Sequence, residues 1–331
     1  MSNDEILNRI RENFPKDHPS YSYLALPSNI TFTSDGSNAV KMSLPSDAVE
    51  TNMQEDKASF EGWALVMKRW GGFEKVVLRW ESLPIDTGTV ECGHYRRFLF
   101  RVANFSHDFS SWFSISPDNA SDLKSPVIDE KKNYYLNRPS GNRGKGGEPA
   151  GKESKLESKY VCGGWSEYLK ELVNAEFLDR QLPVGVFFDP EDHSKRKVSA
   201  ENAIFSRGKS AIDLWGISKS NELLIFELKA DGNTKVGIIS ELYFYGCVMQ
   251  RIQKGQFKYE KHNNSPVDRI AGTRKIHAYF LSPELHPLID KDLVGLLTMG
   301  TAPNVQFHYL RIPTGGGVPI TLGFQPCSMN P

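Results

Sequence analysis

Residues 211–229 read AIDLWGISKSNELLIFELK and place three charged side chains, Asp213, Glu227 and Lys229, within two apolar segments. Moving an isolated charge from water into an apolar interior is costly unless an opposite charge or a metal ion compensates for it. The segment therefore indicates a site in which these three charges have a function.

Two β-strands joined by a tight turn are predicted for this segment. Residues 212–217 and 223–229 are rich in Leu, Ile, Phe and Trp, whereas residues 218–221 are polar and suited to a short hairpin loop. Because apolar residues occupy both faces of the second strand, we expect it to lie in the centre of its sheet.

The two acidic residues are expected to face each other across the hairpin. In an antiparallel pair whose turn is centred near Ser220, Asp213 lies opposite Glu227, and Lys229 shares the face of Glu227. Two carboxylates at this spacing repel each other unless a cation lies between them. Oxygen ligands of this kind favour Mg²⁺ or Mn²⁺, which also bind phosphate oxygens.

This arrangement resembles the core motif of the PD-(D/E)XK nuclease superfamily, in which an acidic residue on one strand is followed by Glu-x-Lys on the next. The resemblance implies that Asp213 and Glu227 hold a divalent metal, and that Lys229 orients or helps to deprotonate the water that attacks the scissile phosphate. Ile212 stands where the family's name has proline. The resemblance also implies a metal-dependent endonuclease that hydrolyses phosphodiester bonds of DNA, in defence against foreign DNA or in repair.

The superfamily usually adds an acidic residue from a helix that precedes the first strand. Residues 164–180 carry apolar side chains at helical spacing and are predicted to form this helix. Glu167, in its first turn, is the candidate for the additional catalytic and metal-binding acid. Glu171 and Glu176 remain alternatives.

A second helix is predicted over residues 234–252, with Thr234 as its N-cap and an apolar stripe on its buried face. Several branches of the superfamily place a Gln and a Tyr four positions apart on this helix, beside the active site. Glu241 and Tyr245 have that spacing, with Glu in place of Gln. Glu241 is then either a further acid around the metal or a salt-bridge partner.

The rest of the C-terminal half predicts two further core strands, residues 274–282 and 305–312, with a short helix between them at residues 291–299. The expected fold class is α/β (α+β), with a restriction-endonuclease-like mixed sheet flanked by helices in residues 161–331. Residues 136–160 are rich in Gly, Lys, Ser and Glu, and this composition predicts a flexible linker.

Residues 1–135 are expected to form a mainly β domain that recognises a substrate or partner. Strands are predicted at residues 59–68, 73–80 and 94–105, after a short helix at residues 4–12. The strands carry basic and aromatic side chains: Lys68, Arg69, Arg79, Arg96, Arg97, Arg101, Trp70, Trp80, Tyr95 and Phe98. Such a surface suits single-stranded nucleic acid. The solvated outer face of an ordinary sheet shows the same alternation, and we favour that interpretation.

The composition is that of a globular chain without overall charge. Of 331 residues, 40 are Lys or Arg and 40 are Asp or Glu, and 39% are hydrophobic. Nucleic acid must then be bound by local basic patches, and Arg207 and Lys209 are expected to contact substrate phosphates because they precede Asp213 closely. The sequence has no apolar run long enough to cross a bilayer and no secretion signal, so we expect a cytoplasmic protein that does not bind membranes. Its four cysteines include no Cys-x-x-Cys pair and are expected to be reduced thiols.

DNA is the expected partner, with single-stranded DNA or RNA as alternatives. A homo-oligomer or a protein partner is also expected, because cleavage of both strands usually takes two active sites. Two other functions remain open: a catalytically inactive nuclease-fold protein that binds nucleic acid or a protein partner, and an interaction protein whose hairpin lies on the surface. The complete set of two acids and a lysine favours the nuclease.

Overall fold

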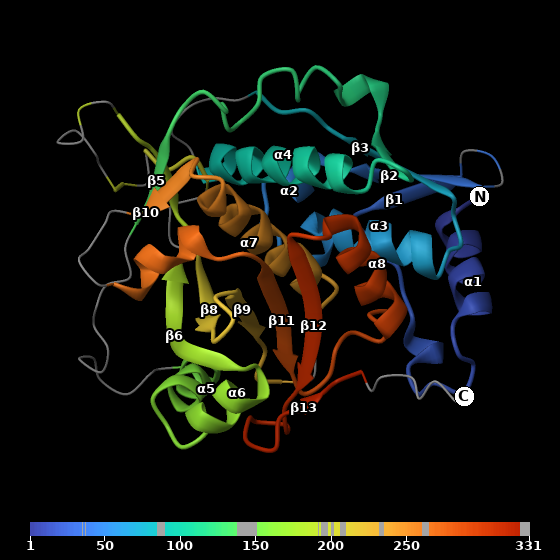
Figure 1. The fold of residues 1–331 in the computed structure, drawn as a ribbon. Helices are drawn as coiled ribbons and strands as arrows, with labels where there is room; N and C mark the ends of the chain where they lie inside the picture. The colour runs from blue at the N-terminus through green and yellow to red at the C-terminus, as the bar shows by residue number, and fades with distance from the viewer. Residues whose placement is uncertain are drawn as a thin grey trace.

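The computed structural model describes residues 1–34, 36, 38–84, 90–137, 151–190, 192, 198–199, 202–205, 210–231, 235–259 and 265–324. In this part of the chain, helices pack against three β-sheets, so the fold is mixed α/β (Figure 1). No helix among the described residues is long and apolar enough to cross a membrane.

The largest sheet has six strands in the order β13-β12-β11-β9-β8-β6. Its strands are β6 (Ala175–Pro183), β8 (Ala211–Ser218), β9 (Leu223–Leu228), β11 (Ile276–Ser282), β12 (Val305–Arg311) and β13 (Thr321–Leu322). β8 pairs antiparallel with both β6 and β9. β11 pairs parallel with both β9 and β12, and β13 pairs antiparallel with β12. The sheet is therefore mixed. β9 lies within it, and all six of its residues are buried, as its two apolar faces predicted.

The hairpin formed by β8 and β9 has the predicted register. Leu214 pairs with Phe226 and Ile217 with Leu223, so the next position of the ladder sets Asp213 opposite Glu227. The turn is closed by the Ser218 hydroxyl, which accepts hydrogen bonds from the backbone N–H groups of residues 220 and 222. The strand, turn and strand predicted for residues 212–229 are confirmed.

Helices cover both faces of this sheet. On the face of Ile225 lies α7 (Ile238–Gln253), which packs in one apolar cluster with β9 and β11. On the other face, α5 (Lys152–Val161) and α6 (Ser166–Leu172) pack against β6 and shield a second cluster. α8 (Lys291–Thr301) packs against β12. The second predicted helix, the two later strands and the short helix between them are all confirmed. Thr234, the predicted N-cap, lies outside the described residues.

The N-terminal half contains a four-stranded sheet in the order β1-β2-β3-β4. The helices and strands of this half are α1 (Asn3–Asn13), η1 (Tyr21–Tyr23), β1 (Thr31–Ser34), β2 (Ala39–Leu44), α2 (Ser46–Val49), η2 (Asp56–Ala58), α3 (Phe60–Arg69), β3 (Lys75–Trp80), α4 (Val90–Asp108), β4 (Phe113–Ile115) and η3 (Pro117–Asn119). A third, small sheet has the order β10-β5-β7. It consists of β5 (Tyr134–Leu136), β7 (Val186–Phe188) and β10 (Phe257–Tyr259), and η5 (Pro266–Gly272) follows it in the chain.

The expectation of a mainly β N-terminal half is wrong, because two of its predicted strands are helices. Residues 59–68 belong to α3 and residues 94–105 to α4, whereas residues 73–80 contain strand β3 and residues 4–12 lie within α1. In α4 the most deeply buried apolar side chains follow a helical repeat: Tyr95, Phe98, Leu99, Val102 and Phe105. Aromatic residues interleaved with arginines produced an apparent alternation that concealed this repeat.

Two further expectations need correction. The helix predicted over residues 164–180 ends at Leu172, because Asn174 takes a left-handed conformation (φ 52°) and strand β6 begins at the next residue. Part of the predicted linker, residues 136–160, forms helix α5, whose Leu156 and Tyr160 are buried. Residues 138–150 lie outside the described residues.

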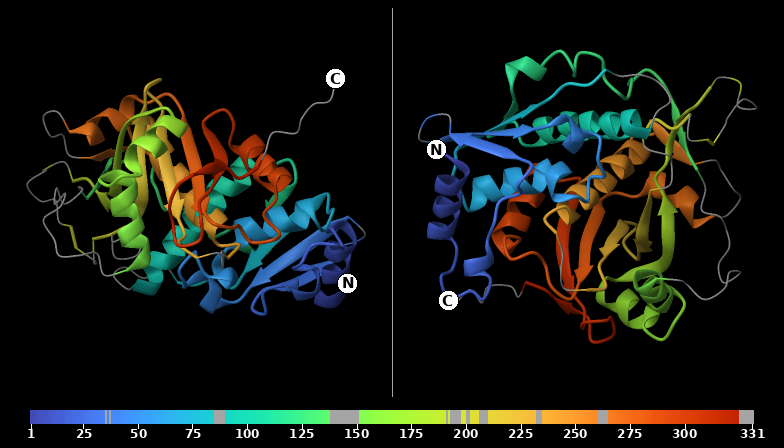
Figure 2. Two further views of the ribbon diagram at one scale, coloured as in Figure 1. Left: turned by 90° about the horizontal axis from the view of Figure 1, so that it is seen from below. Right: turned by 180° about the vertical axis from the view of Figure 1, so that it is seen from behind.

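The two halves of the chain share one apolar core. The largest cluster of buried side chains contains residues from Ile6 to Tyr309, and both α3 and α4 contact α7. In Figure 2 the N-terminal elements, blue to teal, lie along one side of the central sheet. The predicted division into a domain before and a domain after residues 136–160 stays a prediction. The shared core nevertheless brings residues 50–58 and the start of α4 to the edge of the hairpin.

Candidate functional site

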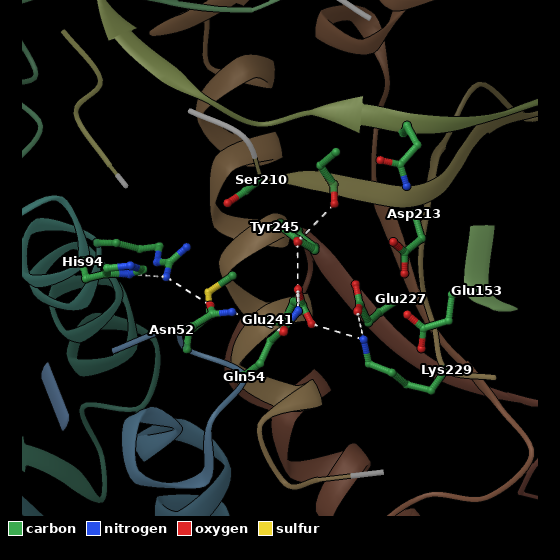
Figure 3. A pocket seen from close by; sticks show the side chains of 14 residues that line it. Asn52, Gln54, His94, Glu153, Ser210, Asp213, Glu227, Lys229, Glu241 and Tyr245 are labelled. Carbon is green, nitrogen blue, oxygen red and sulfur yellow. Dashed lines mark hydrogen bonds and ion pairs between the residues drawn. The ribbon is translucent and has the colours of Figure 1, made fainter. Parts of the chain in front are cut away.

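A pocket of about 500 Å³ opens beside the hairpin, and Asp213, Glu227 and Lys229 all line it (Figure 3). Glu241 and Tyr245, on α7, form another part of its wall. These five residues were predicted to share a site, and the structure brings them together. Two strands and one helix hold them, so their spacing is set by regular backbone hydrogen bonds.

Asp213 is positioned by the backbone of the neighbouring strand. Its Oδ2 accepts a hydrogen bond of 2.9 Å from the N–H of Leu228. Burial raises the pKa of Asp213 to about 8, and the nearby Glu241 acts in the same direction, whereas Lys229 opposes the shift. The positive charge of Lys229 is therefore not enough to offset the burial of the ionised Asp213 carboxylate.

Glu227 and Lys229 form a close ion pair at the centre of the site. The Lys229 Nζ lies 2.5 Å from Oε1 of Glu227, whose side chain is 2% exposed. The second oxygens of Glu227 and Glu241, both Oε2, have no hydrogen-bond partner among the described residues while both groups are ionised, and a proton shared between the two carboxyl groups is one of the causes that raise the pKa of Glu227. Burial, with Asp213 and Glu241 as further causes, raises the pKa of Glu227 well above its ordinary value. A buried carboxylate oxygen without a partner is a strong indication that a ligand belongs there.

Glu241 connects the ion pair to the N-terminal half. Its Oε2 lies 3.7 Å from Lys229 Nζ, and its Oε1 accepts hydrogen bonds from the hydroxyl of Tyr245, at 3.0 Å, and from the amide Nε2 of Gln54. Of the two roles left open for Glu241, the salt-bridge partner is the one that the structure displays.

The positive charge of Lys229 is maintained by its neighbours. Burial by itself lowers the pKa of the ammonium, but Glu227, Glu241 and Asp213 outweigh this effect, so the pKa is raised above its ordinary value. Lys229 is therefore a hydrogen-bond donor at neutral pH.

Negative charge exceeds positive charge in the pocket. The described lining residues include four carboxylates, of Glu153, Asp213, Glu227 and Glu241, against the two cations of Arg97 and Lys229. When all four carboxyl groups are ionised, two negative charges are left over, which is the charge that one divalent cation neutralises; without a cation, the raised pKa values of Asp213 and Glu227 favour their protonated forms.

The donor set fits a hard divalent cation of the Mg²⁺ type. The described residues contain no ready-made group of three or more His, Cys, Asp or Glu side chains for a metal. Mg²⁺ does not need one, because it commonly uses one or two carboxylates and fills its other positions with water and substrate oxygens. Asp213 and Glu227, with its unpartnered Oε2, supply those two carboxylates.

The predicted helix acid does not reach this site. The side chain of Glu167 is 85% exposed and pairs with Lys170 at 2.8 Å. Glu171 is exposed as well, and Glu176 forms a surface ion pair with Arg269. None of the three lines the pocket: Glu167 and Glu171 are exposed on α6, and Glu176 lies on strand β6, because the helix ends at Leu172. Arg207 and Lys209, the predicted phosphate contacts, lie outside the described residues.

Acidic residues on α5 take the place expected for Glu167. Glu153 lines the pocket. One turn later Glu157 is 3% exposed, accepts a 2.9 Å hydrogen bond from Gln181, and contributes to the raised pKa of Asp213. The apolar pair Leu156 and Tyr160, four positions apart, was the sequence signal for this helix. The composition of the surrounding segment concealed it.

The other wall of the pocket comes from the N-terminal half, and the sequence analysis did not assign it to the site. Its polar residues are Asn52, Gln54, His94 and Arg97. The backbone at Gln54 lies close to Gly237, just before α7, and only glycine allows this approach, because a Cβ at residue 237 would lie 2.2 Å from the backbone oxygen of Gln54.

Comparisons of the chain with protein-family models, with curated proteins and with solved structures find no match.

Proposed function

We propose that this protein is a metal-dependent endonuclease of the PD-(D/E)XK type that hydrolyses phosphodiester bonds of DNA. The observation that carries the proposal is the pocket in which Asp213, Glu227 and Lys229 meet on two paired strands, with an excess of negative charge and an unpartnered buried carboxylate oxygen. The order of the surrounding elements supports it. Helix α5, strands β6, β8 and β9 and helix α7 occur in this order in the chain, with α6 and β7 between some of them, and each of the five contributes a residue to the pocket lining.

Asp213 and Glu227 are the residues that would hold Mg²⁺ or Mn²⁺. When bound, the metal supplies charge stabilisation for the phosphate and a more acidic water. The leftover negative charge of the pocket and the raised pKa values of both carboxyl groups support this assignment, because each means that the ionised carboxylates need a compensating cation.

Lys229 acts in this proposal as a cation that orients the attacking water and stabilises negative charge on it. A protonated ammonium is suited to donate hydrogen bonds and unsuited to accept a proton, so we assign it the orienting role and not the role of general base. Glu241 and Tyr245 hold the ammonium in place through the contacts of α7.

Glu153 replaces Glu167 as the proposed acid from the upstream helix. It belongs to α5 and lines the pocket, whereas Glu167 faces solvent. The pair provides a matched comparison, since both are glutamates on neighbouring helices and only one borders the site.

A cleavage assay on plasmid and single-stranded DNA with Mg²⁺ or Mn²⁺ tests the proposal. Asp213→Asn, Glu227→Gln and Lys229→Met should each lower the cleavage rate by about a hundred-fold or more. Glu167→Gln should leave it unchanged. Circular dichroism checks that each variant is folded. Absence of cleavage by the parent, or full activity in all three site variants, would refute the assignment.

A further inference from the structure

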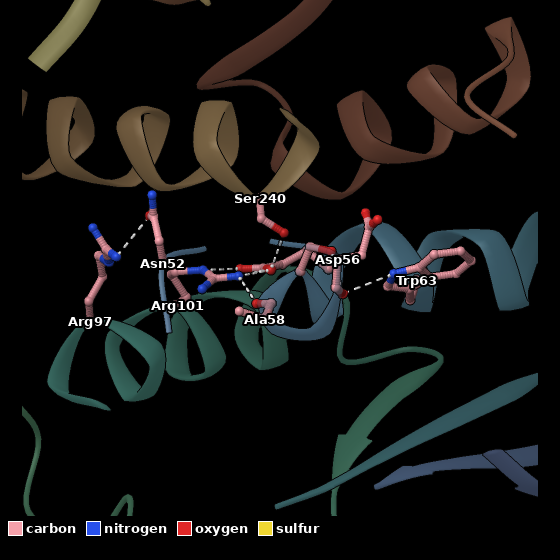
Figure 4. Close-up of polar contacts among 9 residues, drawn as sticks. Asn52, Asp56, Ala58, Trp63, Arg97, Arg101 and Ser240 are labelled. Atoms are coloured by element: carbon pink, nitrogen blue, oxygen red, sulfur yellow. Dashed lines mark hydrogen bonds and ion pairs between the residues drawn. The ribbon is translucent and has the colours of Figure 1, made fainter. Parts of the chain in front are cut away.

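Arg97 is a buried cation at the end of the pocket away from the hairpin. It lies on α4, is 3% exposed and lines the same cavity as the acidic residues. Its contacts differ from those of Arg101, the next arginine on the same face of the helix. Arg101, one turn later, forms a buried ion pair with Glu61, which also accepts a hydrogen bond from the Ser240 hydroxyl (Figure 4).

Arg97, in contrast, forms its side-chain hydrogen bonds with neutral residues, and Glu241 acts on it through space without a direct contact. Its Nη2 donates to Oδ1 of Asn52 at 3.2 Å and lies 2.8 Å from Nδ1 of His94, and its guanidinium stands over the ring of Phe244 at 5.9 Å. Among the described residues, no carboxylate forms an ion pair with it. Burial, with the neighbouring Arg101 as a further cause, lowers the pKa of Arg97 to about 10, so the group keeps its charge at neutral pH.

A buried arginine that retains its charge without an acidic partner needs an anion from elsewhere. Both of its hydrogen bonds to described side chains use Nη2, so Nε–H and Nη1–H donate to no side chain in the described part of the protein. With Nη2 engaged, Nε–H and Nη1–H point to different sides of the guanidinium, and each can donate one charge-assisted hydrogen bond to a phosphate oxygen.

A chain of side-chain contacts ties Arg97 to the acidic end of the pocket. Asn52 accepts from Arg97 and donates from its amide to Gln54 at 3.3 Å, and Gln54 donates to Glu241. A series of hydrogen bonds therefore connects the arginine to Glu241, beside the proposed metal ligands.

We propose that Arg97, oriented by Asn52 and His94, binds a phosphate group of the nucleic acid at the end of the pocket opposite Asp213 and Glu227. The identity of this ligand rests on the proposed function. The phosphate is either a backbone diester beside the cleaved bond or the terminal monoester of a 5′ end, and both present the oxygens that Arg97 recognises.

Fluorescence anisotropy with a short single-stranded oligodeoxynucleotide, labelled at its 3′ end, tests this site. Ca²⁺ is added to neutralise the carboxylates, and a gel confirms that the probe stays intact. Arg97→Gln should weaken binding by roughly ten- to a hundred-fold, the expected cost of a charge-assisted contact to phosphate. Arg97→Lys should lose less, because it keeps the charge but not the fixed planar set of guanidinium donors. Arg96→Gln, on the same helix but outside the pocket, is the matched control and should bind like the parent.

The probe is used with a 5′ phosphate and with a 5′ hydroxyl. Tighter binding of the phosphorylated probe by the parent, but not by Arg97→Gln, assigns the site to a terminal phosphate; equal effects on both probes assign it to a backbone diester. Equal affinity of Arg97→Gln and the parent, with unchanged thermal melting, would overturn the proposal.

The binding result is independent of the cleavage result. Weakened binding in Arg97→Gln without any metal-dependent cleavage by the parent would leave the phosphate site standing and remove the nuclease assignment. If the parent and Arg97→Gln cleaved DNA at equal rates and bound it with equal affinities, the nuclease assignment would stand and the phosphate site at Arg97 would be removed.

Discussion

Replacement of Asp213 by asparagine should stabilise the protein at alkaline pH and weaken its binding of divalent cations. Burial raises the pKa of Asp213 from its ordinary 3.8 to about 8. Between these pH values the unfolded chain has lost the proton and the folded carboxyl retains it. Because the unfolded state then binds fewer protons, the free energy of unfolding falls as the pH rises from 3.8 to about 8, and it is constant above that range.

The magnitude follows from the width of this range. Each pH unit costs about 1.4 kcal/mol for one group, so a shift over about four pH units sets an upper bound near 6 kcal/mol. The pocket admits water, which raises the effective dielectric constant, and we expect about 2–4 kcal/mol in the protein. Asparagine keeps an oxygen that can accept the hydrogen bond from Leu228 N–H, so the variant removes the charge with little change in packing.

The assay is urea denaturation of the parent and of Asp213→Asn at pH 4.5 and pH 8 in EDTA. The difference between the two proteins is the quantity of interest, because it cancels the titration of other groups. His308 is one of these: burial lowers its pKa to about 4, so its contribution to stability is lost as the pH falls below 6.5, opposite in sign to that of Asp213. Asp213→Asn should exceed the parent in stability at pH 8 and match it at pH 4.5.

Addition of Mn²⁺ provides the second half of the test. A cation at a hundred times its dissociation constant should stabilise the parent by about 2.7 kcal/mol at pH 8 and have little effect on Asp213→Asn. Glu167→Gln serves as the surface control and should respond to Mn²⁺ like the parent. Equal stability of Asp213→Asn and the parent at pH 8 in EDTA would contradict the burial of an uncompensated carboxyl. Undiminished stabilisation of Asp213→Asn by Mn²⁺ would exclude Asp213 as a metal ligand.

Two further changes test the packing that holds the site. Gly237→Ala should lower activity and the melting temperature, because the new Cβ would lie 2.2 Å from the Gln54 backbone oxygen and displace that loop; Gly295→Ala, where a Cβ meets no atom within 4 Å, should be neutral or stabilising by about 0.5–1 kcal/mol in thermal melting. Arg101→Met should reduce the free energy of unfolding by about 3–5 kcal/mol, because it leaves Glu61 buried without its partner, and the double variant with Glu61→Leu should recover much of the loss in urea denaturation. If Gly295→Ala lowered the melting temperature as much as Gly237→Ala, the steric explanation would be contradicted. If the double variant were no more stable than Arg101→Met, the explanation by an unpaired buried Glu61 would be contradicted.

The hairpin could be predicted because its determinants are local. Apolar residues at both faces of the second strand, a polar turn and the antiparallel rule are enough to place Asp213 opposite Glu227. The helix that carries Glu241 and Tyr245 is predictable for the same reason, since its apolar repeat is contained within residues 238–252.

The wall opposite the hairpin could not be predicted in this way. Gln54 and Glu241, which hydrogen-bond to each other, are 187 positions apart in the chain, and nothing near either residue indicates the contact. α4 was predicted as a strand because its arginines and aromatic residues alternate, and this error hid the position of Arg97. Glu153 was missed because the polar composition of residues 136–160 outweighed the apolar pair within α5.

The two ends of the pocket carry groups of opposite sign that do not contact each other: Glu227, whose ion pair is with Lys229, and Arg97. Glu227 keeps a buried oxygen without a partner, and Arg97 keeps a buried guanidinium without an acid, although the same helix shows in Arg101 and Glu61 how readily such charges pair. Neutral amides, of which Gln54 is one, hold the two ends apart. A pair of charges that served stability alone would gain by direct contact. Their separation across one cavity is therefore best explained by a ligand with both signs of charge, a divalent cation together with a phosphate.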